Sequence, residues 1–277
     1  MEKVNYTNSL DIHSLLDRYR TGSIAPTDTI ASVYDRIERY ADPAVWIYLA
    51  PIAETLERAK ALQNQDPQQL PLYGIPFAIK DNLDWAGVPT TAGCPPFART
   101  PGRSSAVVER LCAAGAIAIG KTNMDQFATG LVGTRTPYGV CRNPFDRRYI
   151  PGGSSSGSAA AVSAGLVSFA LGTDTAGSGR VPAAFTNIIG LKPTCGSVST
   201  RGLLPAVRSL DCVSVFALTC ADAASVLQVA SGFDAEDAFS RRRETKVLPD
   251  LSRLRVGVPA DGELEFFGNV EAEGRYR

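Results

Sequence analysis

Histidine is nearly absent from this sequence of 277 residues, where it occurs once, as His13. A Ser-His-Asp triad needs a histidine beside its nucleophile, and histidine-based metal sites usually use two or three such ligands. His13 lies in a stretch with ordinary amphipathic helical spacing, which favours a surface or helix-packing role. The scarcity of histidine therefore argues against both classes of site.

Paired cysteines of the CxxC type are also missing, although the chain contains six cysteines. Several lie in apolar segments, such as ERLCAAGAIAI around Cys112 and DCVSVFAL around Cys212, which favours buried, reduced thiols over a disulfide framework or a zinc site. No GxGxxG follows a strand, and no glycine-rich loop ends in Gly-Lys-Ser/Thr, so nucleotide binding is not indicated. We therefore expect neither a metal nor an organic cofactor.

The sequence also lacks a net charge and a long apolar run. Its 28 Lys and Arg residues balance 28 Asp and Glu residues, which leaves no overall field for nucleic acid or an anionic membrane. No apolar run approaches the roughly 20 residues of a membrane-spanning helix, and the N-terminal MEKVNYTNSLD lacks the layout of a signal peptide. We therefore expect a cytoplasmic protein that binds neither nucleic acid nor membrane.

What the chain does contain is a globular composition, with 44% hydrophobic residues, and alternating helical and strand-like segments. Two amphipathic helices are predicted within 7–41, broken near Gly22 and Pro26. The alternation beyond them is typical of an α/β fold, with a central mixed β-sheet flanked by helices on both faces. The expected strands are 46–50, 74–80, 116–120, 167–174, 188–194, 213–218 and 254–259, and the expected helices are 51–65, 105–115, a small-residue helix after 158, 182–187 and 221–232.

A run of glycine and serine, GGSSSGS at 152–158, stands immediately before the apolar run AAAVSAGLV. Flexible linkers are not usually flanked on both sides by dense apolar sequence, so the run indicates a site whose hydroxyls and N–H groups satisfy one another. A second serine, Ser178 in GTDTAGSGR, follows the strand expected at 167–174. Glycine-rich turns at strand ends point successive N–H groups into one concavity, as a tetrahedral oxyanion requires. The alternative interpretation is two tight turns without catalytic function.

Lys80, at the end of the apolar run GIPFAI, is a candidate for the base that histidine cannot supply. An ammonium drawn into an apolar, poorly solvated place has its pKa lowered by several units and then serves as a base. The alternative is a structural pair between Lys80 and Asp81 or another carboxylate. Lys121, at the end of AIAIG, is a second candidate for the base.

These segments resemble a known family. The stretch from GGSSSGSAAAV through GTDTAGSGRVPAAF to IIGLKPT resembles the signature of the amidase signature family of serine hydrolases, and GIPFAIKDN resembles that family's catalytic-lysine segment. The family's triad consists of a lysine, a serine that follows a cis peptide bond and a nucleophilic serine 24 positions later, a spacing that Ser154 and Ser178 keep. The resemblance, over about residues 10–265, implies an amidase signature fold. The implied roles are Lys80 as general base, Ser154 as relay, Ser178 as nucleophile, Thr175, Ala176 and Gly177 with Ser178 as oxyanion-hole N–H donors, and Asp174 and Arg180 as supports.

Within the family, several segments most resemble the allophanate hydrolase branch, among them KDNLDWAGVPTTAGCPPFA, TAGSGRVPAA and RSLDCVS. The implied reaction is attack of Ser178 on the terminal amide of allophanate, release of ammonia and hydrolysis of the acyl-enzyme by water. The carboxylated product would decompose to ammonia and carbon dioxide, which implies a functional link to urea carboxylase. The alternatives are another amidase, the glutaminase subunit of a tRNA-dependent amidotransferase, or a non-catalytic remnant. The TAGSGR and DQFATGLVGTR segments argue against the glutaminase.

Members of this family are usually much longer than 277 residues, so we expect an amidase signature domain whose C-terminal part is missing. The tyrosine and arginine that hold the allophanate carboxylate in the family are expected beyond that point. The expected division is an N-terminal helical segment at 1–65, a catalytic signature region at 66–232, and a connection with a last strand at 233–277. Apolar surface at the cut predicts homo-oligomerisation.

Overall fold

The computed structural model describes residues 9–242, 252, 254–260 and 262–277. The chain divides into two compact units, residues 1–243 and 244–277. In the described ranges, no helix combines the length and the apolar character that crossing a membrane requires.

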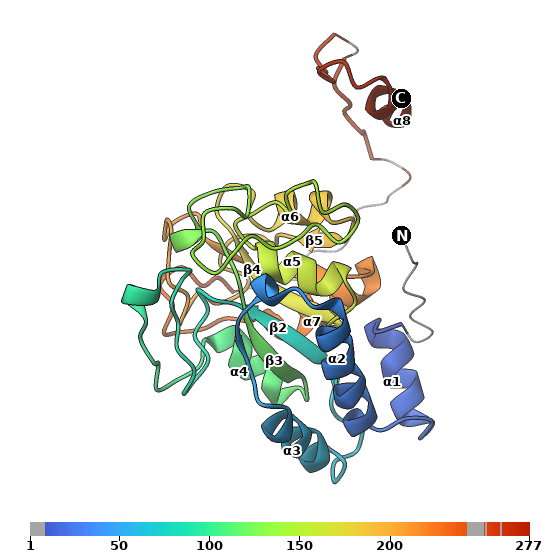
Figure 1. Cartoon of the computed structure of the whole chain (residues 1–277), viewed down its shortest axis with the longest axis vertical. Helices are drawn as coiled ribbons and strands as arrows, with labels where there is room; N and C mark the ends of the chain where they lie inside the picture. Colours follow the sequence, from blue (N-terminus) through green and yellow to red (C-terminus); the bar gives the residue numbers. More distant parts are fainter. Residues whose placement is uncertain (1–8, 243–251, 253, 261) are drawn as a thin grey trace. The chain divides into compact units, whose positions relative to one another are not determined.

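Six strands form one mixed sheet within residues 9–242 (Figure 1). They are β1 (Trp46–Leu49), β2 (Pro76–Lys80), β3 (Ile117–Thr122), β4 (Phe169–Asp174), β5 (Ile189–Leu191) and β6 (Cys212–Ala217). In space the order is β1-β3-β2-β4-β6-β5. The central strand β2 is parallel to both β3 and β4, whereas the pairs β1 with β3, β4 with β6 and β5 with β6 are antiparallel.

Helices cover both faces of this sheet. They are α1 (Ile12–Arg20), α2 (Pro26–Tyr40), α3 (Ile52–Leu62), α4 (Ala106–Ala113), α5 (Ser156–Ser163), α6 (Arg180–Phe185) and α7 (Cys220–Ala230). The connection β2-α4-β3 leads toward the β1 edge of the sheet, whereas β3-α5-β4 leads toward the β5 edge. Because both crossovers are right-handed, α4 and α5 lie on opposite faces of the sheet. Helix α5 packs across β2, β3, β4 and β6, while α4 packs on α7. The predicted fold class, α/β with a central mixed sheet, is confirmed.

The three parallel strands are buried along their whole length. Phe77 on β2 and Phe169 on β4 stack with ring centroids 5.1 Å apart, both fully buried. Strands that are covered on both faces usually have continuous apolar sequences. Lys80 and Asp174 interrupt this pattern at the carboxyl ends of β2 and β4, where both are fully buried. The sheet therefore brings two buried ionisable groups to one edge.

Helix α5 consists of small residues because it lies between the sheet and the 3-10 turn η1 (Pro43–Val45). Its residues 156–162 are all buried. At Gly157 the backbone N–H donates to the Asn123 carbonyl at 2.9 Å, and a Cβ atom would overlap the Val45 carbonyl oxygen. A larger side chain here would push the helix, and the glycine-serine loop before it, away from the strand ends.

The strand predicted at 254–259 is wrong. The described residues 254–260 form neither helix nor strand, and Val256 and Val258 are 81% and 76% exposed. A strand needs a hydrogen-bonded neighbour, and the described part of the smaller unit contains no second strand, only the helix α8 (Val270–Tyr276). Alternating apolar residues at 254, 256 and 258 indicated a strand without indicating a partner.

The close approach at Gly157 predicts a stability effect. We expect Gly157→Ala to lower the free energy of unfolding by about 1–3 kcal/mol, the usual cost of forcing atoms into a packed core, measured by urea denaturation. Gly102→Ala is the matched control because a Cβ at Gly102 has no atom within 4 Å. Equal stability of the two variants would contradict the packing described for α5.

Candidate active site

Lys80 ends β2 with its side chain completely buried. Its Nζ donates to Ser154 Oγ at 2.7 Å and to Thr173 Oγ1 at 2.8 Å. Among the described residues, no carboxylate forms an ion pair with this amine. Burial lowers the pKa of Lys80 to about 7, although the more distant carboxylates of Asp125 and Asp174 act in the opposite direction. A substantial share of this amine is therefore neutral near pH 7 and able to accept a proton.

Lys121, the second candidate for the base, has a different environment. It is also fully buried, but its Nζ lies 3.0 Å from Asp81 Oδ1 and donates to Thr90 Oγ1 at 3.0 Å. The other Asp81 oxygen accepts from the Thr91 N–H at 2.9 Å. Asp81 is thus the partner of Lys121 and not of Lys80. Of the alternatives left open by the sequence, the structural lysine-carboxylate pair exists, but at Lys121.

Ser154 is held at the start of the glycine-serine loop by backbone contacts on both sides. The Gly153–Ser154 peptide bond is cis. The Gly153 N–H donates to the Leu131 carbonyl at 2.8 Å, and the Ser154 carbonyl accepts from the Asp125 N–H at 3.0 Å. These contacts fix Ser154 Oγ, itself fully buried, against the amine of Lys80.

Asp125 is a buried residue of this region that the sequence did not single out. Its two carboxylate oxygens accept from the N–H groups of Gly133 at 3.0 Å and Arg135 at 2.8 Å. It therefore folds the segment 125–135 around Gly153, which has no room for a side chain because a Cβ there would overlap the Asp125 carboxylate. The sequence did contain an indication of this role, because Asp125 lies inside DQFATGLVGTR, but that segment was considered only for its resemblance to one branch of the family.

Two further serines of this run, Ser155 and Ser158, bind strand backbone, which corrects the expectation that the groups of the loop satisfy one another. Ser158 Oγ donates to the Leu171 carbonyl at 2.8 Å, and Ser155 Oγ to the Thr173 carbonyl at 3.3 Å. Their side chains are fully buried. Hydroxyls are needed here because the carboxyl end of β4 presents carbonyl groups to a helix that would otherwise cover them with apolar atoms.

The loop that carries Ser178 is closed by Asp174. One carboxylate oxygen of Asp174 accepts from the Gly179 N–H at 3.0 Å and from Arg180 Nε at 3.0 Å, and the other lies 3.0 Å from an Arg180 terminal nitrogen. Burial raises the pKa of Asp174, but the hydrogen bonds from Arg180 and Gly179 outweigh burial and hold it below the ordinary value. Asp174 and Arg180 contact each other across this loop, and their role as its supports stays a prediction.

The turn between Asp174 and Gly179 presents N–H groups that are not used within the chain. The N–H groups of Ala176, Gly177 and Ser178 donate to no other group in the described residues. Gly177 has a φ of 144°, which favours glycine. Thr175 is held through its hydroxyl, which donates to the carboxylate of Asp211. Unused, neighbouring N–H donors are the arrangement that stabilises a developing oxyanion.

Ser178 itself is 4% exposed, and its hydroxyl makes no hydrogen bond within the described part of the chain. The structure therefore forms one of the two contacts that a lysine-serine-serine relay uses, from Lys80 to Ser154. The contact from Ser154 to Ser178 is not formed. The roles of the three residues remain predictions.

Metal ligands do not gather at this site. Among the described residues, no three His, Cys, Asp or Glu side chains stand as the ligands of one metal ion would. The carboxylates of Asp125 and Asp174 are occupied by N–H donors. The groups free to act on a substrate are a hydroxyl, an amine and N–H donors.

Known proteins resemble this chain in sequence and in structure. Residues 28–269 match the family model described as Amidase. Urea amidolyase from Lachancea kluyveri is 52% identical over 233 residues, which is 83% of this chain and 13% of that protein. One of the subunits of glutamyl-tRNA(Gln) amidotransferase from Symbiobacterium thermophilum is 43% identical, over 88% of this chain and 52% of that protein. The structure of Kluyveromyces lactis allophanate hydrolase matches with a TM-score of 0.78 and 48% identity, over 84% of this chain and 39% of that one.

The lowered pKa of Lys80 predicts a pH-dependent stability. The ordinary lysine pKa is 10.5, and in the folded chain it is about 7. Between these values the unfolded chain binds the extra proton, so the free energy of unfolding of the parent rises with pH in this range. Lys80→Met removes that dependence. We therefore expect the stability of Lys80→Met relative to the parent to increase as pH falls from about 10 to about 7, and to level off below, in urea titrations.

Lys121→Met is the comparison variant at pH 7, because burial lowers the pKa of Lys121 too, while Asp81 acts in the opposite direction. It leaves the buried Asp81 carboxylate without its ion-pair partner, which is expected to cost about 3–5 kcal/mol at pH 7. Adding Asp81→Asn is expected to recover much of that loss. A Lys80→Met difference that does not change with pH would contradict the lowered pKa.

Proposed function

Because this chain belongs to the amidase family, we propose that it is an amide hydrolase in which Lys80, Ser154 and Ser178 form the catalytic triad. The observation that carries the proposal is the contact of 2.7 Å between a fully buried, carboxylate-free amine and the Ser154 hydroxyl. A neutral amine in that position draws the hydroxyl proton, whereas an ion-paired lysine such as Lys121 cannot.

In the proposed reaction one proton moves from Ser178 to Lys80 through Ser154, and then from Lys80 to the leaving nitrogen. Ser178 Oγ attacks the amide carbonyl carbon while its proton passes to Ser154 Oγ and the Ser154 proton passes to Lys80 Nζ. The negative charge on the carbonyl oxygen is received by N–H groups of the turn at Thr175, Ala176 and Gly177, with that of Ser178. The carbon-nitrogen bond then breaks, and the leaving nitrogen takes the proton back from Lys80 through Ser154. Water hydrolyses the acyl-enzyme by the same route.

Carboxylates near the amine support the protonated state that this reaction creates. Asp125, Asp174 and Asp211 each favour the charged form of Lys80 without an ion pair to it. Each of them accepts hydrogen bonds from other groups. The ammonium that forms during acylation is therefore stabilised by fixed charges, while burial keeps the resting amine basic but not permanently protonated.

We propose allophanate as the substrate, and thereby a functional link to urea carboxylase. Support comes from the identity of 48% to a protein named allophanate hydrolase and 52–54% to proteins named urea amidolyase. The chain spans 39% of the first and 12–13% of the others. The second candidate is a glutaminase, since the matching amidotransferase subunits are 38–43% identical over most of this chain. The third is a non-catalytic remnant that keeps the fold.

A fluorophosphonate probe tests the triad because it reacts with an activated serine hydroxyl and needs no substrate pocket. We expect labelling of the parent at Ser178, with Ser178→Ala abolishing it and Lys80→Ala or Ser154→Ala slowing it strongly. Since only the neutral amine accepts a proton, the labelling rate is expected to fall about tenfold for each pH unit below about 7 and to be constant above it.

The control variant for labelling is Ser14→Ala, an exposed serine on α1 that is expected to leave the rate unchanged. Labelling of the parent that is insensitive to Lys80→Ala would disprove the assignment of the base, and Lys121 would be the next residue to test. No labelling of folded parent protein would favour the non-catalytic remnant.

Ammonia release separates the candidate substrates. We expect the parent to release ammonia from allophanate faster than from glutamine, measured with both compounds at the same concentration, and Ser178→Ala to release none from either. A preference for glutamine would replace the first proposal with the glutaminase.

A further inference from the structure

Two cysteines, Cys195 after β5 and Cys212 at the start of β6, lie close to Lys192 and its neighbour in the chain. Lys192 Nζ lies 4.0 Å from Cys195 Sγ and donates to the Pro193 carbonyl at 2.9 Å. The same carbonyl accepts from Cys212 Sγ at 3.2 Å. One ammonium group and one carbonyl group thus hold both sulfurs, and both cysteines are free thiols.

The two thiols also act on each other directly. Burial raises the pKa of Cys212 to about 12, Lys192 acts in the opposite direction, and a hydrogen bond with the Cys195 thiol adds to the increase. The antiparallel pairing of β5 with β6, in which Leu191 lies opposite Val215, brings the two chain segments side by side. Neighbouring sulfurs on adjacent segments are the first geometric condition for a disulfide.

The two cysteines differ in their access to solvent. Cys195 is half-buried and donates to the Leu210 carbonyl at 3.5 Å, whereas Cys212 is 2% exposed. A small oxidant therefore reaches Cys195 first, and the ammonium of Lys192 stabilises the anionic sulfur that reacts with it. An accessible cysteine beside a cation, with a second thiol in contact, is the arrangement in which oxidation ends in a disulfide.

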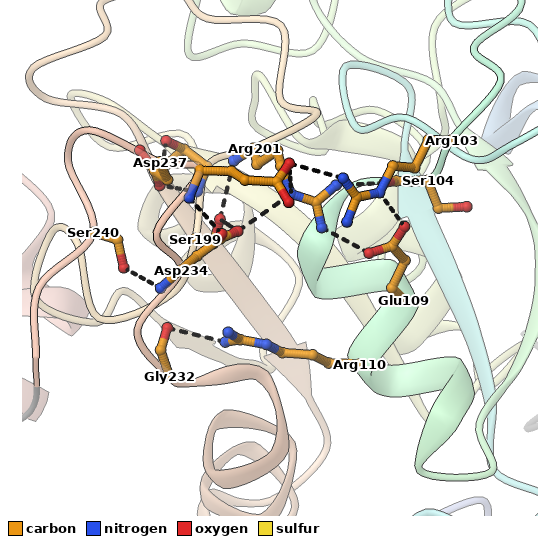
Figure 2. A network of polar contacts seen from close by, with 12 residues as sticks. Arg103, Ser104, Glu109, Arg110, Ser199, Arg201, Gly232, Asp234, Asp237 and Ser240 are labelled. Carbon is orange, nitrogen blue, oxygen red and sulfur yellow. Dashed lines mark hydrogen bonds and ion pairs between the residues drawn. The ribbon is translucent and has the colours of Figure 1, made fainter.

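The segment 196–201, directly after the first cysteine, is fixed by a network of polar contacts, which Figure 2 shows. Arg201 contacts Glu109 at 2.7 Å and Asp234 at 3.3 Å. Ser199 Oγ donates to Asp234 at 2.7 Å. Because Glu109 belongs to α4, these contacts tie the segment to the body of the fold. A bond between the two sulfurs would therefore move the chain at the second cysteine more than at the first.

The chain at the second cysteine contacts the loop that carries Ser178. Cys212 lies opposite Asp174 in the antiparallel pair of β4 and β6. Its neighbour Asp211 accepts the hydrogen bond from the Thr175 hydroxyl. To form a disulfide, the Cys212 sulfur has to leave its carbonyl acceptor and turn toward the other cysteine. A change at this thiol is thus passed to the turn through one adjacent residue.

We propose that hydrogen peroxide links Cys195 and Cys212 by a disulfide, and that this disulfide displaces Asp211 and slows the reaction at Ser178. In the first step the sulfur of Cys195 takes one oxygen of the peroxide as the O–O bond breaks, which gives a sulfenic acid and water. The sulfur of Cys212 then attacks that of Cys195, the S–O bond breaks, and a second water leaves. In all, the two thiols lose two electrons and two protons, which reduce one peroxide molecule to two molecules of water.

Peroxide treatment of the reduced parent chain, stopped with catalase, tests this inference. We expect peptide mapping to find the cross-link between Cys195 and Cys212. We expect the rate of fluorophosphonate labelling at Ser178 to fall about tenfold or more, because a misplaced oxyanion turn costs rate. Dithiothreitol is expected to restore the rate. Cys195→Ser is expected to form no cross-link and to keep its labelling rate after peroxide.

Two further variants separate the steps. Cys212→Ala is expected to stop the oxidation at the sulfenic acid of Cys195, which dimedone traps. Cys220→Ser, which removes an exposed cysteine on α7, is the matched control and is expected to respond to peroxide as the parent does. Circular dichroism checks that each variant is folded.

Absence of the cross-link in the folded, peroxide-treated parent, or a cross-link that leaves the labelling rate unchanged, would overturn the inference. The effect on labelling rests on the proposed function, so hydrogen exchange of the turn 174–180 supplies a readout that does not. We expect faster exchange there in the cross-linked chain, and equal exchange in both states would contradict the displacement of Asp211. Failure of the proposed function is seen separately, as absence of labelling in the reduced parent.

Discussion

The burial of an amine whose hydrogen-bond partners are hydroxyl groups is the constraint on which the rest of this structure depends. Lys80 and Lys121 lie on adjacent parallel strands, and both are completely buried. One contacts Ser154 and Thr173, and the other contacts the carboxylate of Asp81. An ion pair holds the ammonium, whereas hydroxyls accept or donate according to the state of the amine. Two lysines at equal depth therefore differ in chemistry because of their partners.

The arrangement of the sheet explains how hydroxyl partners reach the amine. Strands β2 and β4 are parallel neighbours, so Lys80 and Thr173 come to the same edge. Ser154 reaches that edge from the loop before α5, on one face of the sheet, and it can approach because Gly153 and Gly157 carry no side chain where other backbone passes. The sequence of small residues is thus a packing requirement of the site, and its serines supply the hydrogen bonds that the strand ends lack.

Local sequence patterns were sufficient to predict the position of those residues whose environment is set by their own segment. Lys80 follows an apolar run that becomes a buried strand, and the turn after β4 presents Ser178 as expected. The contributions of Asp125, Thr173 and Asp211 were not predicted because each acts through residues elsewhere in the chain, such as Thr175 for Asp211. The strand expected at 254–259 failed for the same reason, since an alternating pattern indicates a strand but not its partner. The spacing of 24 positions between Ser154 and Ser178 matched the family pattern, but it did not predict the distance in space between their hydroxyl groups.

Two opposing effects set the strength of the amine as a base. Burial alone would lower the pKa of Lys80 so far that the neutral amine became a weak proton acceptor, whereas carboxylates in direct contact would keep it protonated. Asp125, Asp174 and Asp211 instead act at a distance, each with its hydrogen-bonding capacity directed to other groups. The hydrogen bonds that shape the loops, from backbone N–H groups, the Arg180 side chain and the Thr175 hydroxyl, thus also keep these carboxylates from pairing with the lysine. The same hydrogen bonds consequently fix the conformation of the loops and set the pKa of Lys80.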